Sequence, residues 1–321
     1  MNSKHCPYCH CSRVIKYGRV SGRQRYRCKN CHKVWASISR KGRRRQQIWH
    51  DYVDGMTAGR VAEKYSISAR SVRRILAAHN LPALSQKPRC LVIVADATYF
   101  SRTHGELVVV DPNAQVPANE NFLIYHHRLS GSERIIDYQI ALDSIQAMGY
   151  HIQAVTIDGR RGVKELCVNR GLPVQYCHFH QLLTITQCLT RHPKLPANAE
   201  LRQIAMTLTH TSRNELADKL DNWYQQYGSW LKERYLEPGT GRKRYVHDRT
   251  RRAYYSLMRN LPYLFTYQDF PSLNIPNTTN KLDGAFGVAK RKLKAHPGIT
   301  DELKTKMLYS FLSGATERGN N

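Results

Sequence analysis

The stretch Leu91–Phe100 reads LVIVADATYF, and it decides the fold class of the chain. A run of branched apolar residues without polar alternation is typical of a strand buried on both faces, as at the centre of an α/β sheet. The run ends at Asp96, and a carboxylate in such a place needs a cation or hydrogen-bond donors. Asp96 is therefore a candidate site residue, and the alternative is a turn that begins at the strand end.

The segments after this strand predict the rest of an α/β core. Strands are predicted over residues 106–111, 121–129, 151–158 and 172–177, and helices over residues 135–148 and 160–169. Three antiparallel strands followed by crossover helices and further strands is the order of an RNase H-like fold. The first and fourth strands are neighbours in that order. Asp96 and Asp158, each ending an apolar strand, are therefore expected to converge on one edge of the sheet.

Converging carboxylates favour metal-dependent chemistry on phosphodiesters. Hydrolysis or strand transfer needs two Mg²⁺ (or Mn²⁺) ions about 3.5–4 Å apart, which activate the attacking oxygen and stabilise the leaving one. A third carboxylate completes the coordination, and its predicted source is Asp283, on a helix that Asn277 or Thr278 caps. We expect Asp96 to bridge both ions.

The charge of the chain indicates a polyanionic partner. The formal net charge is +26 over 321 residues, and the first 90 residues hold 21 lysine and arginine residues against three acidic ones. Arginine and tyrosine are interleaved there without an amphipathic membrane helix, which favours nucleic acid over lipid. No apolar run approaches the roughly 18 residues of a membrane span, and no signal-peptide core is seen. We therefore expect a cytoplasmic protein with reduced cysteines.

Two CxxC pairs, Cys6 with Cys9 and Cys28 with Cys31, predict a zinc ribbon. The 18 residues between the pairs are expected to form a hairpin that turns at residues 21–22. Zinc supplies folding energy that so short a segment cannot draw from a core. The alternatives are a disulfide or unrelated thiols. Further potential ligands nearby are Cys11, His5 and His10.

Helical periodicity between residues 46 and 81 predicts a helix-turn-helix. The last break between helical pieces carries a serine cap and a buried-type Ile67. Packing of Ala62, Ile67, Val72 and Ile75 leaves three cations outward on the last helix, namely Arg70, Arg73 and Arg74. This arrangement suits a recognition helix in a major groove. Any small three-helix bundle shows similar spacing, and the charge favours DNA binding.

Four motifs, VADATYF, TIDGRRG, QYCHFH and NTTNKLDGAF, resemble those of the Mutator-type transposases of bacterial insertion sequences, in particular variants with an N-terminal zinc ribbon. The resemblance covers essentially the whole chain. It implies an RNase H-like core in which three acidic residues bind the metals that cut and join DNA ends; the matching positions are Asp96, Asp158 and Asp283. The family usually has glutamate at the third position. The shorter Asp283 implies a helix closer to the metals or a ligand that acts through water.

The same resemblance implies a CxxH element between the second and third acids, which Cys177 and His180 match. Two ligands are too few to make a zinc site by themselves. The other readings are a buried cysteine at a strand end and a histidine packed over the acids. We therefore favour a supporting role beside the metal ligands over zinc binding.

The helix that carries Asp283 shows two stripes with the same helical spacing. One stripe is apolar, and the adjacent one combines Asp283 and Gly287 with two lysines. We hypothesise that Gly287 admits the DNA backbone, and that three cations hold phosphates beside the metals: Lys290, Arg291 and Lys294. A solvated basic helix end is the alternative.

Residues 181–276 read as a helical insertion between the second and third acids, a feature that in the resembling family embraces the DNA end. Ser212 and Glu215 form a predicted capping box that opens a long helix. A basic patch at residues 241–252 is expected to contact phosphates. Trp223 or Trp230 is a candidate for stacking on a base, although aromatic residues at helical spacing more often belong to a core.

Together these predictions describe a multi-domain α+β protein. Its predicted parts are a zinc ribbon (1–40), a helix-turn-helix (41–86), a first RNase H-like core segment (87–180), an all-helical insertion (181–276) and a last core segment (277–321). The expected cofactors are Mg²⁺ or Mn²⁺ at the acids and Zn²⁺ in the ribbon.

The expected function is that of a DNA transposase that binds terminal inverted repeats and catalyses metal-dependent strand cleavage and strand transfer. Its partners would be double-stranded DNA, at element ends and target, and no membrane. The resemblance further implies a homodimer or larger synaptic complex associated with a bacterial nucleoid. The alternatives are a metal-dependent nuclease on the same fold and a DNA-binding regulator with an inactive core.

Overall fold

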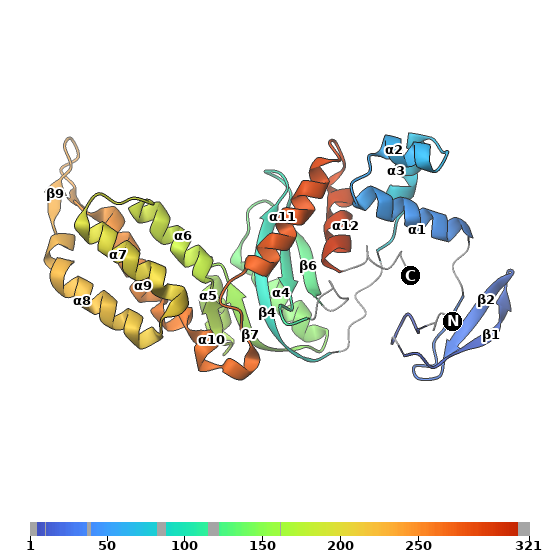
Figure 1. Ribbon diagram of the computed structural model, residues 1–321, viewed down its shortest axis with the longest axis horizontal. Helices are drawn as coiled ribbons and strands as arrows, with labels where there is room; N and C mark the ends of the chain where they lie inside the picture. Colours follow the sequence, from blue (N-terminus) through green and yellow to red (C-terminus); the bar gives the residue numbers. More distant parts are fainter. Residues whose placement is uncertain are drawn as a thin grey trace. The chain divides into compact units, whose positions relative to one another are not determined.

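The computed structural model describes residues 5–9, 11–36, 40–81, 88–114, 122–160 and 162–313; His10, one potential zinc ligand, lies outside them. The fold is mixed α+β, and the course of the chain can be followed in Figure 1. The chain divides into two compact units. Unit 1 comprises residues 1–87, 114–123 and 285–321, and unit 2 comprises residues 88–113 and 124–284. Across the described ranges, no helix is both long and apolar enough to cross a membrane.

Unit 2 is built on a five-stranded sheet with the order β6-β5-β4-β7-β8. The strands are β4 (Cys90–Tyr99), β5 (Gly105–Val110), β6 (Leu123–Leu129), β7 (His151–Ile157) and β8 (Val174–Tyr176). β4 pairs antiparallel with β5 and parallel with β7, and β7 pairs parallel with β8. The predicted adjacency of the first and fourth strands is therefore confirmed.

The sequence accounts for the buried centre of this sheet. Leu91 to Ala95 are at most 3% exposed, as expected for a strand covered on both faces. Two helices follow the predicted ranges: α4 (Ile135–Ala147) and α5 (Val163–Asn169). In α4 the positions i, i+3, i+4 and i+7 are buried in the core, namely Tyr138, Ala141, Leu142 and Ile145.

Helices dominate residues 181–276, with their own apolar core. They are α6 (His178–Leu189), α7 (Pro196–Met206), α8 (Arg213–Leu231), α9 (Asp248–Leu264) and α10 (Thr266–Asp269), with short 3₁₀ turns at Thr207–His210 and Pro271–Leu273. The capping box of Ser212 and Glu215 at the start of α8 is confirmed. Trp223 is 1% exposed and its Nε1 donates to the carbonyl of Ala197 at 3.0 Å, so it belongs to the core and has no face available to a DNA base.

The prediction that this insertion is all helical is wrong at one place. β9 (Arg234–Leu236) and β10 (Lys243–Tyr245) form an antiparallel hairpin between α8 and α9. Pro238 and two positive-φ glycines, Gly239 and Gly241, lie in its loop. Proline lacks the N–H that a helix interior requires, and glycine supplies the left-handed turn conformation, so the segment closes a hairpin instead of continuing the helix.

Unit 1 begins with a three-stranded sheet: β1 (Val14–Val20), β2 (Arg23–Cys28) and β3 (Val34–Ala36). The predicted hairpin with its turn at residues 21–22 is confirmed. The predicted helices are also present, as α1 (Arg40–Val53), α2 (Ala58–Lys64) and α3 (Ala69–Ala77). Ser68 caps α3 by accepting a hydrogen bond from the backbone N of Ser71.

The end of the chain contributes to the core of unit 1. Helix α11 (Asn280–Lys294) crosses from unit 2 into unit 1 at residue 285, and α12 (Asp301–Leu312) follows. Met307 of α12 is buried with residues of α1, α2 and α3, and Trp49 Nε1 donates to Ser310 Oγ at 3.2 Å. His296 stacks on Tyr52 with ring centroids 4.0 Å apart. The three N-terminal helices therefore share their core with a segment more than 200 residues away.

Candidate functional site

Asp96 and Asp158 are neighbours because of the strand register. The last parallel pair of β4 and β7 is Ala95 with Ile157, so the next residue of each strand is one of the two aspartates. Asp96 is 7% exposed, and its Oδ1 accepts a hydrogen bond from Ala97 N at 2.8 Å. Asp158 Oδ1 accepts from the backbone N of Arg160 at 3.0 Å, in the turn that leaves the strand. The expected convergence of these two carboxylates on one edge of the sheet is therefore found.

Asp283 reaches the same edge through the segment that precedes α11. Thr156 Oγ1 donates to the carbonyl of Pro276 at 2.8 Å, which holds that segment to the sheet. The carbonyl of Thr279 accepts from the backbone N of Asp283 at 3.1 Å, and Thr279 Oγ1 donates to Asp283 Oδ2 at 3.0 Å. Thr279, rather than the predicted Asn277 or Thr278, therefore stands at the start of the helix.

The three carboxyl groups act on one another. Burial, the charges of Asp158 and Asp283, and a hydrogen bond with Asp283 raise the pKa of Asp96 to about 8. A carboxyl group in a poorly solvated place beside two like charges keeps its proton unless a cation is present. The charges of Asp158 and Asp283 therefore oppose ionisation of Asp96, and a cation bound beside them would favour it.

The aspartates are more widely spaced than the ligands of a single closed ion. In the part of the chain that the structure describes, the only group of three or more Cys, His, Asp or Glu ligand atoms that all lie within 4.8 Å of one another is formed by four cysteines. Asp96, Asp158 and Asp283 therefore do not form such a close group. A pair of ions about 3.5–4 Å apart spreads its carboxylates more widely than one ion does.

Cys177 and His180 contact the residues behind the aspartates. The Cys177 Sγ lies 3.4 Å from Thr279 Oγ1, and the backbone N of Thr279 donates to the same sulfur at 3.3 Å. Burial by itself raises the pKa of Cys177, but hydrogen bonds from His180 and Thr279 bring it below the ordinary value. The bond to Cys177 raises the pKa of His180 to about 9, against its desolvation. The side chain of Cys177 thus adjoins Thr279, which in turn holds Asp283.

Gly159 is required by its surroundings. Its φ is +91°, and a Cβ there would lie 1.9 Å from the Tyr176 hydroxyl oxygen. The residue after Asp158 must therefore be glycine for the strand end to keep this turn.

We expect Gly159→Ala to destabilise the protein by about 2–4 kcal/mol and to weaken Mn²⁺ binding at the aspartates, because the backbone next to Asp158 has to move. Gly171→Ala is the matched control, since Gly171 has φ +70° but nothing within 4 Å of its Cβ position. The control is expected to cost only about 1–2 kcal/mol. Thermal unfolding and Mn²⁺ titration measure both effects, and equal losses in the two variants would contradict the packing argument.

A further acid near the aspartates, Glu133, was not predicted from the sequence. Glu133 is 7% exposed and accepts a hydrogen bond from the Tyr138 hydroxyl at 2.5 Å. Burial and the charge of Asp158 raise its pKa, although the bond from Tyr138 opposes them. Glu133 precedes α4 and ends no strand, so no local pattern distinguishes it from a surface glutamate.

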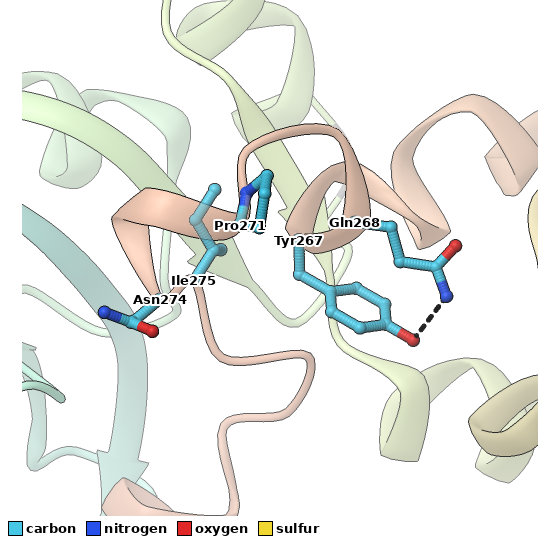
Figure 2. A pocket seen from close by; sticks show the side chains of 5 residues that line it. All are labelled: Tyr267, Gln268, Pro271, Asn274 and Ile275. Carbon is cyan, nitrogen blue, oxygen red and sulfur yellow. Dashed lines mark hydrogen bonds between the residues drawn. The ribbon is translucent and has the colours of Figure 1, made fainter.

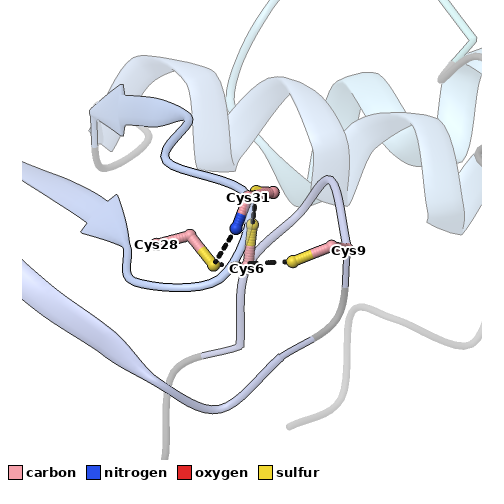
Figure 3. A group of neighbouring side chains, drawn as sticks. All are labelled: Cys6, Cys9, Cys28 and Cys31. Carbon is pink, nitrogen blue, oxygen red and sulfur yellow. Dashed lines mark hydrogen bonds between the residues drawn. The ribbon is translucent and has the colours of Figure 1, made fainter.

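The four-cysteine cluster joins the two CxxC pairs (Figure 3). Sγ to Sγ distances are 3.5 Å for Cys6 with Cys31 and for Cys9 with Cys28. A disulfide would need about 2.05 Å, whereas four sulfurs at 2.3 Å from one ion in a tetrahedron lie roughly 3.8 Å apart. A backbone hydrogen bond from Cys11 lowers the pKa of Cys9 to about 6, which favours the thiolate that a metal binds. The cluster is therefore compatible with Zn²⁺.

The basic residues predicted to contact DNA on α3 and α11 lie in unit 1, whereas the predicted basic patch at residues 241–252 lies in unit 2. Three exposed cations face outward on α3, namely Arg70, Arg73 and Arg74. On α11, Arg291 and Lys294 are exposed and Lys290 is half-buried. The nearest atom to a Cβ on Gly287 is Arg291 Nη1 at 3.8 Å, so Gly287 is not needed for packing within the protein. Its predicted role toward DNA stays a prediction.

A surface pocket in unit 2 lies apart from these groups (Figure 2). It is lined by Tyr267, Gln268, Pro271, Asn274 and Ile275. The only hydrogen bond between these side chains runs from Gln268 Nε2 to the Tyr267 hydroxyl, at 3.0 Å. The lining has no carboxylate, imidazole or thiol, so the pocket offers no catalytic acid or base near neutral pH.

Comparison with known proteins adds no relative. No protein-family model matches the chain, and a search of curated proteins finds no match either.

Proposed function

We propose that the protein is a DNA transposase of the Mutator type, which cuts and joins DNA ends with two divalent metal ions. The observation that carries the proposal is the convergence of Asp96, Asp158 and Asp283 from two adjacent strand ends and a helix start. The sheet order supports it, because three consecutive antiparallel strands followed by parallel strands with crossover helices is the RNase H-like order.

The donor set suits Mg²⁺ or Mn²⁺, since both prefer carboxylate oxygens. Asp96, Asp158 and Asp283 would hold the ions. When bound, the ions activate the attacking oxygen and stabilise the leaving one. Thr279 orients the carboxylate of Asp283 through its 3.0 Å hydrogen bond.

DNA recognition is assigned in this proposal to unit 1. Its ribbon hairpin and α3 carry exposed arginines, and no acidic residue occurs before Asp51. Such a surface binds phosphates through charge, and a helix with outward arginines can read base edges in the major groove. Zn²⁺ bound by the four cysteines would hold the ribbon in its folded form.

Asp283→Ala tests the proposal against its rivals. The substrate is a duplex that carries the element's own end, taken from the DNA flanking the coding region, with Mg²⁺ or Mn²⁺. We expect the wild-type protein to nick this end and to join a pre-cut end to a second duplex, and the variant to lose both activities by at least about 10³-fold. Asp143→Ala is the control, because Asp143 is exposed and pairs with Arg170 outside the site.

The other outcomes separate the alternatives. Cleavage without joining would identify a nuclease on the same fold. DNA binding without any activity that depends on Asp283 would identify a regulator with an inactive core, and the transposase proposal would then be wrong.

A further inference from the structure

Arg160 is held in one place beside the aspartates by Glu133. Its Nη2 donates to the main-chain carbonyl of Glu133, and its Nη1 lies 3.8 Å from the Glu133 Oε2. The backbone N of the same arginine donates to Asp158 Oδ1 at 3.0 Å. One residue thus fixes the orientation of a site carboxylate with its backbone and presents a cation next to it with its side chain.

Glu133 is a rigid support for this cation. Its side chain is 9% exposed, and the Tyr138 hydroxyl donates to its Oε1 at 2.5 Å. Its backbone N donates to the Tyr99 hydroxyl oxygen at 2.7 Å, which ties the segment to strand β4. A buried acid near Asp158 adds to the negative charge of the site, and this costs free energy unless the acid has a cation to hold. Arg160 is that cation.

The guanidinium retains donors for a ligand. It carries five N–H groups in a planar fork, and the side chain is 41% exposed. A fork of this kind binds phosphate oxygens in pairs, which a lysine ammonium does not. Ionised carboxylates at the site repel the DNA backbone where no metal ion neutralises them, so a fixed arginine beside Asp158 lowers the electrostatic cost of bringing a phosphate to the site.

We propose that Arg160 is a phosphodiester-binding residue that holds the backbone of the DNA strand being cut beside Asp158, and that Glu133 positions it. This inference rests on the proposed function, since it names how the same site takes hold of its substrate. It predicts that contact with one particular phosphate is lost when the guanidinium is lost.

Arg160→Gln and Arg160→Lys test the contact by single-turnover cleavage of the end duplex with Mn²⁺. We expect a loss of about 10²–10³-fold for glutamine, the range found when one preorganised donor to a reacting group is removed, and a smaller loss for lysine. Mn²⁺ affinity should be unchanged or higher in Arg160→Gln, because a cation beside the aspartates has been removed. Arg170→Gln is the matched control, as Arg170 pairs with Asp143 at 2.7 Å away from the aspartates.

A second arm uses the wild-type protein, so it does not depend on how a variant folds. Each phosphate near the cut is replaced in turn by a neutral methylphosphonate. We expect one position at which wild-type cleavage falls about as far as in Arg160→Gln, and at which the variant loses nothing more.

The outcomes distinguish this inference from the function on which it rests. Cleavage by Arg160→Gln within about threefold of wild type, weaker Mn²⁺ binding in that variant, or additive losses at every phosphate would overturn the inference and leave the transposase proposal standing. If the wild-type protein does not cleave the end duplex at all, both fall together.

Discussion

Asp96→Asn is expected to lower metal-dependent DNA cleavage by at least about 10³-fold while making the metal-free protein more stable. The first effect follows from the proposed bridging position of Asp96, because an amide is a weak ligand and two ions lose one shared carboxylate, a loss of several kcal/mol in the transition state. The second follows from its surroundings, since Asp96 is buried beside Asp158 and Asp283. Asp96→Asn removes a destabilising charge and a proposed metal ligand together, so it should raise the stability of the metal-free protein and lower the rate of cleavage.

The repulsion between Asp96 and the neighbouring carboxylates should make the stability of the metal-free protein depend on pH. The pKa of Asp96 is raised to about 8 in the folded protein from an ordinary value of 3.8, so between these pH values the folded state binds more protons than the unfolded state. The contribution of Asp96 to the stability of the metal-free wild type then falls as the pH rises from about 4 to about 8. Asp96→Asn lacks this contribution. We expect the two proteins to be alike near pH 4 and the variant to be more stable by up to about 5 kcal/mol at pH 8, or roughly 10–20 °C in Tm, because each unit of raised pKa corresponds to about 1.4 kcal/mol.

Mn²⁺ provides the control for this experiment. The ion competes with the proton on Asp96, so Mn²⁺ should stabilise the wild type increasingly as the pH rises and should stabilise Asp96→Asn much less. Calorimetry at pH 5 and pH 8, with and without Mn²⁺, measures both trends. A variant that cleaves DNA as well as the wild type would refute the assignment of Asp96, and so would a wild type whose stability without metal is independent of pH.

Cys28→Ser is expected to unfold the ribbon and to lower DNA affinity by at least about tenfold. Cys28 is fully buried, and its sulfur faces that of Cys9 at 3.5 Å. Residues 5–36 contain few other buried side chains, so the free energy of metal binding, about 10–16 kcal/mol in small zinc domains, would be the main source of their stability. The ribbon carries arginines expected to contact phosphates. An unfolded ribbon would lose conformational entropy when it became ordered on DNA, and this would weaken binding.

Cys11→Ser is the matched control for the ribbon. Cys11 lies next to the cluster in sequence but is not one of its four members. We expect about one Zn²⁺ per chain in the wild type and in Cys11→Ser, and none in Cys28→Ser, by metal analysis of the purified proteins. Chelation of the wild type should reproduce the loss of DNA affinity. Zinc retained by Cys28→Ser and lost by Cys11→Ser would show that the ligand set has been misassigned.

Local patterns in the sequence were sufficient to predict the positions of two of the three aspartates. Asp96 and Asp158 end apolar strands, and the parallel register of β4 and β7 makes such positions neighbours. The strand order followed from the succession of elements, because connections between strands obey few topologies. The four cysteines could be predicted as one metal site in the same way, since the ligands of one ion recur at short fixed spacings.

No local sequence pattern identifies the side chains that other elements bring close to the aspartates. Glu133 lies in the loop before α4, and its place near Asp158 depends on how that helix packs on the sheet. Thr279 reads as one of several polar residues in NTTN, and only its contacts with Cys177 and Asp283 distinguish it. The hairpin of β9 and β10 was missed because its strands are only three residues long, too short for an alternating pattern.

The sequence by itself therefore determined the strands of the five-stranded sheet, the two helices that follow them, the cysteine pairs and the two strand-end acids, because each depends on residues close together in the chain. Only the tertiary structure decided what surrounds them. It brought Asp283 to Asp96, Glu133 to Arg160 and Trp49 to Ser310, and it set the raised pKa of Asp96. These contacts join residues from 27 to 261 positions apart in the chain, and no periodicity encodes such pairs, since they follow from how whole elements pack.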